Sequence, residues 1–213
     1  MRRPLPALAA VAAGALLAAT ALGGCSADEP DSAILPVSSV PGTVESGFTV
    51  TGLDLFGPVA SPPEAVEAAR AGALAALDGY LQRAVLQALS RPPAGDLGPV
   101  FTTAAAGRVA SGPDREALVD ENLPKLTGAP RVDTATARLA VLAGSDGVPA
   151  VVNAAVEVKV VGDTDGGQVV VGRHGDVGLT VESGTWRIDS YDLVVGRTTP
   201  EGSSSTTVTS APA

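Results

Sequence analysis

The apolar residues of this 213-residue chain repeat with two different periods along the sequence. Over residues 61–90 they recur every three or four positions, which is typical of the buried face of a helix. From Arg131 to residue 198 they alternate with polar residues, as in strands that bury one face. The pattern predicts an α+β fold, with a long N-terminal helix and short helices packed on a curved antiparallel sheet of about four strands.

The helical stretch carries signals at both ends. The sequence Ser61-Pro62-Pro63-Glu64 predicts a capping box in which Ser61 is the N-cap. Pro92 and Pro93 end the stretch, because proline lacks the amide hydrogen and clashes with the preceding turn. Residues 96–123 are predicted to form shorter helical pieces, one of which begins at residues 111–114.

Turn signals divide the alternating part into strands at residues 145–147, 165–167 and 183–184. In the last strand Trp186 and Ile188 point inward, but so does Tyr191, which has the opposite parity. One extra residue would restore the register, so we expect a β-bulge near Asp189-Ser190. Arg173 falls on the apolar face of the third strand, which means either a buried ion pair or an error in this register.

Composition divides the chain into four parts: a signal peptide over residues 1–24, a flexible tether over 25–60, a folded domain over 61–198 and a disordered tail over 199–213. The tether is rich in proline, serine and acidic residues and has few large apolar ones. Residues 44–57 alternate like a short strand, and the sequence leaves open whether they join the domain.

The N-terminus has the layout of a secretory signal peptide: Arg2 and Arg3, an apolar run over residues 5–22, and then Leu22-Gly23-Gly24-Cys25. The final quartet resembles the lipobox of bacterial lipoproteins. The resemblance implies cleavage between Gly24 and Cys25, lipidation of Cys25, and a position on the outer face of the cytoplasmic membrane. Two alternatives are an ordinary signal with an unrelated cysteine and a membrane-spanning helix. The helix is disfavoured because the apolar run does not exceed the ~20 residues that a bilayer needs.

Charge and cysteine content exclude several functions. The chain has 23 acidic and 14 basic residues, a net charge of −9, which disfavours nucleic acid and electrostatic adhesion to anionic lipid headgroups. Cys25 is the only cysteine and His174 the only histidine. With Cys25 lipidated, no thiol remains for a disulfide or a thiolate metal site, and one histidine cannot form a cluster. We expect no metal and no cofactor.

The last strand contains Gly184-Thr185-Trp186-Arg187-Ile188-Asp189-Ser190-Tyr191-Asp192. This segment resembles the "G-x-W-x-I" signature of nuclear transport factor 2-like (SnoaL-like, cystatin-like cone) domains, especially small secreted or membrane-associated actinobacterial members. The resemblance covers about residues 61–198. It implies a sheet that curls around the long helix into a cone, whose open end holds a hydrophobic ligand, a catalytic site or a partner surface. It also implies that the chain could form a homodimer through its sheet.

The enzymes that this family includes resemble ketosteroid isomerase, scytalone dehydratase and polyketide cyclases, with Asp, His and Tyr side chains inside the cone. Two pairs are weak catalytic candidates here: His174 with Asp176, which share one face of a strand, and Asp189 with Tyr191. The face that carries His174 also carries polar residues and looks solvated. Tyr191 is typical of a core tyrosine. We therefore expect no catalytic residue.

Three functions follow from these observations. The first is a lipid-anchored, non-catalytic domain in the cell envelope that binds a hydrophobic small molecule, an envelope lipid or an envelope protein. The second is a small isomerase, dehydratase or cyclase that uses the cone cavity. The third is an accessory module of envelope machinery, for which the exposed sheet would be the docking face.

Overall fold

The computed structural model describes residues 47–90, 93–200 and 204–212. The predicted signal peptide, the cleavage site at Gly24, the lipidation site Cys25 and most of the tether lie outside these residues. Within the described ranges, no helix is both long enough and apolar enough to cross a membrane.

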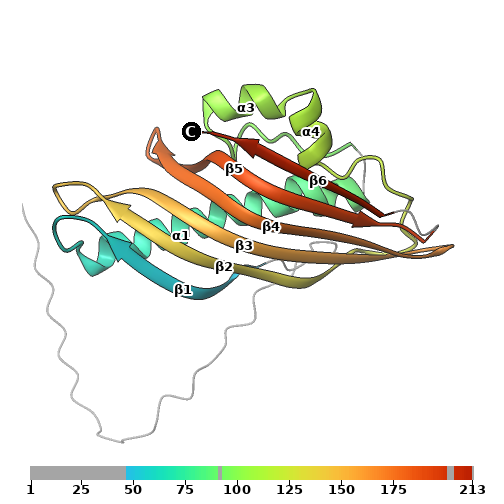
Figure 1. Cartoon of the computed structure of the whole chain (residues 1–213), viewed down its shortest axis with the longest axis horizontal. Helices are drawn as coiled ribbons and strands as arrows, with labels where there is room; N and C mark the ends of the chain where they lie inside the picture. Colours follow the sequence, from blue (N-terminus) through green and yellow to red (C-terminus); the bar gives the residue numbers. More distant parts are fainter. Residues whose placement is uncertain (1–46, 91–92, 201–203, 213) are drawn as a thin grey trace, which may run out of the picture. The chain divides into compact units, whose positions relative to one another are not determined.

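One six-stranded mixed sheet dominates the domain, and its strands lie side by side in the order in which they occur in the sequence (Figure 1). The first strand, β1, is parallel to β2, and every later neighbour is antiparallel. The strands are β1 (Thr49–Phe56), β2 (Arg131–Ala143), β3 (Pro149–Thr164), β4 (Gly167–Glu182), β5 (Thr185–Thr198) and β6 (Ser204–Ala211).

The helices cover one face of this sheet, which we call the inner face; the opposite face is the outer face. Figure 1 shows α1 running behind β2 to β5, while α3 contacts β5 and α4 contacts β6. The helical segments are α1 (Pro63–Tyr80), the π-helical η1 (Leu81–Leu86), α2 (Gln87–Ser90), α3 (Thr103–Val109) and α4 (Pro113–Leu118).

The predicted fold class was wrong. Instead of one long helix on about four antiparallel strands, the structure is mostly a mixed sheet of six strands. Strands hold 47% of the described residues and helices 25%. The helical stretch is divided into α1, η1 and α2, because a π-helical turn interrupts the regular backbone pattern. The N-cap is Pro62 and has no side-chain hydrogen bond, so the predicted capping box at Ser61 does not form.

The two strands that lie outside the predicted domain boundaries are the edges of the sheet. β1 lies within the predicted tether, and β6 lies within the tail predicted to be disordered. An edge strand has one neighbour and little buried surface, so its sequence shows a weaker apolar pattern than a central strand. The Ser- and Thr-rich β6 gains its order by pairing with β5 along its whole length.

Several local predictions are confirmed. Turns join the strands at residues 145–146, 165–166 and 183–184. In the pairing of β4 with β5, Gly178 faces Ser190 and Leu179 faces Ile188. Asp189 is therefore the extra residue of a bulge, at the predicted place.

Small side chains bring α1 close to the inner face. Gly72 shows how close: a Cβ atom there would lie 2.2 Å from Cδ1 of Trp186. Nearer the other end of α1, Phe101 packs edge-on against Tyr80 and Tyr191, with ring centroids 6.1 and 6.2 Å away. Branched apolar side chains of β2 to β5 fill the rest of this interface.

Candidate functional site

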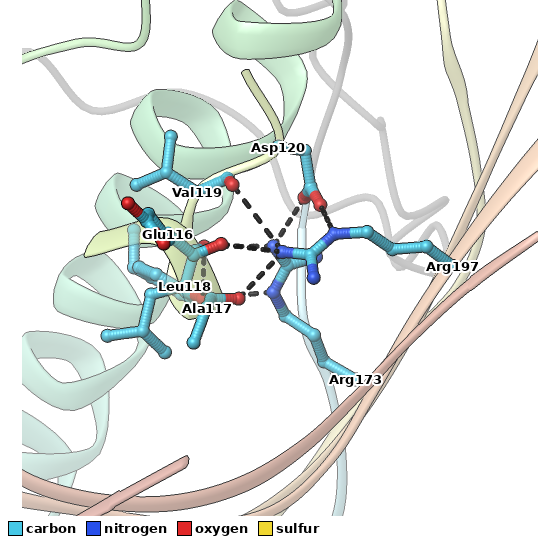
Figure 2. Close-up of polar contacts among 8 residues, drawn as sticks. Glu116, Ala117, Leu118, Val119, Asp120, Arg173 and Arg197 are labelled. Carbon is cyan, nitrogen blue, oxygen red and sulfur yellow. Dashed lines mark hydrogen bonds and ion pairs between the residues drawn. The ribbon is translucent and has the colours of Figure 1, made fainter. Parts of the chain in front are cut away.

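A buried carboxylate links the helices to the sheet. Asp120 follows the end of α4, and its side chain is fully buried. It binds Arg173 of β4 through Oδ2 and Arg197 of β5 through Oδ1, the latter at 2.6 Å from Nε (Figure 2). Arg173 pairs with Val195 and Arg197 with Val171, so the two arginines are diagonal neighbours on the inner face. We call Tyr80, Asp120, Arg173 and Arg197 the arginine cluster.

Backbone carbonyls at the end of α4 complete the cluster. Arg173 donates from Nη2 to the carbonyl oxygen of Leu118 at 2.9 Å, and Arg197 donates from Nη2 to that of Ala117 at 2.7 Å (Figure 2). The hydroxyl of Tyr80 donates to the Leu118 oxygen at 3.0 Å and accepts from Nε of Arg173 at 2.9 Å. These carbonyls have no intrahelical partner at a helix C-terminus, which is where cations are favoured.

The cluster remains charged despite its burial. Burial alone lowers the pKa of Arg173, but Asp120 and Tyr80 more than offset it, so that pKa is raised and the guanidinium stays protonated. Burial raises the pKa of Tyr80, which keeps its hydroxyl a donor. Two guanidinium groups share one carboxylate, and Nη1 of Arg173 has no hydrogen-bond partner among the described residues. The cluster therefore carries an excess positive charge.

A cavity of about 340 Å³ lies beside the arginine cluster. Asp120 and Arg197 form part of its wall, together with Asn122, Ser204 and Ser205. The side chain of Arg197 is 14% exposed. Arg197 thus connects the buried cluster to the solvent.

The predicted pair His174 and Asp176 lies on the outer face, away from the helices. His174 is exposed and pairs with Glu157 of the neighbouring strand β3. Asp176 is also exposed and accepts a long hydrogen bond of 3.4 Å from Asn153. The register of β3 with β4 is continuous past these residues, so no bulge turns them inward. Both side chains lie on an open surface, whereas acid–base catalysis in a cone requires side chains inside an enclosed cavity.

The second candidate pair is occupied by structural contacts. The hydroxyl of Tyr191 donates to Oδ2 of Asp114 in α4 at 2.7 Å. Burial, followed by the Asp114 carboxylate, raises the pKa of Tyr191 above its ordinary value. The carboxylate of Asp189 accepts a hydrogen bond of 2.7 Å from Thr102, the N-cap of α3. Both side chains therefore hold a short helix against β5.

Sequence reasoning found only part of the arginine cluster. The alternation placed Arg173 on the apolar face, and of the two readings offered, the buried ion pair is confirmed. Its partner Asp120 was missed, although an acidic residue directly after Leu118-Val119 was a usable signal. In the part of the chain that the structure describes, no three His, Cys, Asp or Glu side chains gather as they would to hold a metal.

The outer face also carries an exposed apolar row. Phe56, Leu142 and Val151 face one another across β1, β2 and β3. Their exposed fractions are 57%, 43% and 40%. We call these three residues the outer apolar row. Contiguous exposed apolar surface of this kind marks interaction sites more often than scattered apolar residues do.

No protein-family model, no curated protein and no solved structure matches this chain. The resemblance to nuclear transport factor 2-like domains therefore stays a prediction from the sequence.

Proposed function

We propose that this protein is a lipoprotein anchored through Cys25 on the outer face of the cytoplasmic membrane. In this proposal its domain binds an envelope protein through the outer face of the sheet and does not turn over a substrate. The observation that carries the binding proposal is the outer apolar row, Phe56, Leu142 and Val151. The anchor rests on the sequence Leu22-Gly23-Gly24-Cys25.

The composition of the outer face favours a protein partner over a lipid surface. The outer apolar row is bordered on the same face by polar groups, including the ion pair of Asp54 with Arg138. An apolar centre with a polar rim is the usual anatomy of a protein interface. A net charge of −9 opposes close approach to anionic lipid headgroups.

The state of the polar side chains supports binding over catalysis. His174 and Asp176 are exposed, and Tyr191 and Asp189 are engaged with α4 and α3. An acid–base enzyme that used either pair would have to free or enclose it first. An accessory role in a larger envelope assembly is a specific form of the same proposal.

Two Glu substitutions test the binding proposal. Leu142→Glu places a charge in the outer apolar row. Val208→Glu places one at the opposite edge of the same face, on β6, where Val208 is 67% exposed and pairs only with Val194. A photo-crosslinker at Val151 in the full chain, expressed in its own cells, should give a defined adduct. That adduct should be lost in the Leu142→Glu variant and kept in the Val208→Glu variant. Equal yields in both variants, or an adduct with lipid alone, would contradict the proposal.

Cys25→Ser tests the anchor separately. The wild-type chain should sediment with membranes and leave them only in detergent, because two acyl chains give stable anchoring. The variant should take up none of the labelled fatty acid that the wild-type chain incorporates, and it should keep residues 1–24, because the lipobox directs both lipidation and cleavage. Equal incorporation of the label into the variant and the wild type, or none into the wild type, would contradict the lipoprotein assignment without bearing on the outer apolar row.

A further inference from the structure

We infer that the cavity beside Arg197 is a binding site for a small oxyanion, the phosphate or carboxylate group of a ligand. The site is built by the arginine cluster on the inner face, so it is independent of the outer apolar row. It goes beyond the proposed function because it gives the domain a small-molecule ligand as well as a partner.

The first argument is charge balance. Arg173 and Arg197 share the single carboxylate of Asp120, and Arg173 is almost completely buried. The carbonyl oxygens of Ala117 and Leu118 offset part of the excess charge with their dipoles, but they carry no net charge. An anion bound at Arg197 would supply the missing negative charge, and a buried charge is costly unless it is paired.

The second argument is that Arg197 has a hydrogen-bond donor to spare for a ligand. Arg197 uses Nε for Asp120 and Nη2 for the carbonyl oxygens of α4, and its Nη1 makes no hydrogen bond to another described residue. Arginine presents its donors in a planar fork that matches carboxylate and phosphate oxygens. The buried Nη1 of Arg173, also without a partner in the described ranges, indicates that the cluster has more donors than acceptors.

The third argument is the cavity itself. Its volume of about 340 Å³ accommodates a phosphate with part of the molecule that carries it. Asn122, Ser204 and Ser205 line it. Ser205 pairs with Arg197 across β5 and β6, so its hydroxyl shares the face of Arg197 and is a further potential donor.

One residue that lines the cavity is acidic and would weaken the binding of an anion, so its removal tests the inference. Glu116 lines the cavity and is exposed, so its carboxylate would repel an oxyanion at Arg197. Its side chain makes no hydrogen bond or ion pair with another described residue. Glu116→Gln should therefore tighten binding without harming the fold, by about threefold as expected for one exposed charge.

The experiment is a titration of the full chain, in a non-ionic detergent, with inorganic phosphate and separately with acetate at constant ionic strength. Amide and arginine side-chain NMR signals report the binding. We expect saturable shifts at Arg197, Ser205 and Asn122, with Ser205→Ala weakening the affinity. Arg138→Gln is the matched charge control, because it removes an exposed arginine on the outer face, and it should leave the affinity unchanged.

Each outcome decides the inference. Tighter binding in Glu116→Gln and weaker binding in Ser205→Ala support it, and the relative affinity for phosphate and acetate identifies the oxyanion. Absence of saturable shifts in both the wild type and Glu116→Gln would overturn it. An equal response in Arg138→Gln and Ser205→Ala would also overturn it, because binding would then reflect overall charge alone. Arg197→Gln is a secondary variant, to be used only if circular dichroism shows that it folds.

Discussion

Asp120 and Arg173 form an ion pair in which both side chains are almost completely buried, at 0% and 1% exposure. The two residues are 53 positions apart. Their contact connects the end of α4 to the middle of β4. Arg197 binds the other carboxylate oxygen from β5, so a single acidic side chain joins one helix end to two strands.

Removal of this carboxylate should destabilise the domain strongly. Asp120→Asn leaves the buried guanidinium of Arg173 and the half-buried one of Arg197 without a counter-charge, and we expect the free energy of unfolding to fall by about 3–5 kcal/mol. Urea unfolding followed by circular dichroism measures the change. Asp54→Asn is the control, because its partner Arg138 is 65% exposed and such pairs contribute at most about 1 kcal/mol. Similar losses in both variants would contradict a stabilising role for the buried pair.

The ionisation of Asp78 should destabilise the fold at neutral pH. Burial raises the pKa of Asp78 above its ordinary 3.8, and a hydrogen bond from the amide of Phe48 lowers it by less. The folded state therefore holds the proton more tightly than the unfolded chain does. The stability that this proton gives is fully present below pH 3.8 and is lost as the pH rises through the folded pKa.

Asp78→Asn should consequently be more stable than the wild type at neutral pH, since asparagine keeps an oxygen acceptor but cannot ionise. The difference should shrink at about pH 3.5, where the wild-type carboxyl is largely protonated. Thermal unfolding at both pH values gives the comparison. A variant that is less stable than the wild type at neutral pH would refute this account of Asp78.

Tyr191 should contribute to stability through its hydroxyl. Tyr191→Phe removes the hydrogen bond to Asp114 at 2.7 Å and keeps the ring that packs against Phe101. We expect the free energy of unfolding to fall by about 1 kcal/mol or somewhat more, because the acceptor is a carboxylate. Denaturant titration measures this loss. In an Asp114→Ala background, which lacks the acceptor, Tyr191→Phe should have little further effect, and an equal loss in both backgrounds would contradict this role of the hydroxyl.

Two glycines on neighbouring strands should respond oppositely to alanine. Gly175 has φ +141°, and a Cβ there would lie 2.1 Å from the backbone oxygen of Asp192. Gly175→Ala should therefore destabilise the domain by about 1–3 kcal/mol. Gly196 has open space around the equivalent position, so Gly196→Ala should be neutral or slightly stabilising. Melting temperatures of the two variants test the contrast, and equal shifts would be inconsistent with the described backbone at Gly175.

Local features were predictable because adjacent residues determine them. The turns at residues 165–166 and 183–184 follow from glycine and small polar residues that adopt turn conformations. The bulge at Asp189 followed from the change of parity between Ile188 and Tyr191, which both had to face the same core. The same alternation placed Arg173 on the inner face.

The strand periods, the turns, the bulge and the place of Arg173 on the apolar face could be read from the sequence alone, because each depends on residues a few positions apart. Tertiary structure decided the rest. β1 and β6 are ordered by pairing with a single neighbour. The alternation over residues 44–57 left open whether β1 joins the domain, and the Ser- and Thr-rich sequence of β6 indicated no strand. Asp120 becomes the centre of a site only when α4 brings it to Arg173 and Arg197, 53 and 77 residues away. Such a contact depends on the path of the whole chain. A local signal, such as an acidic residue directly after Leu118-Val119, can mark Asp120 as a candidate but does not identify its partners.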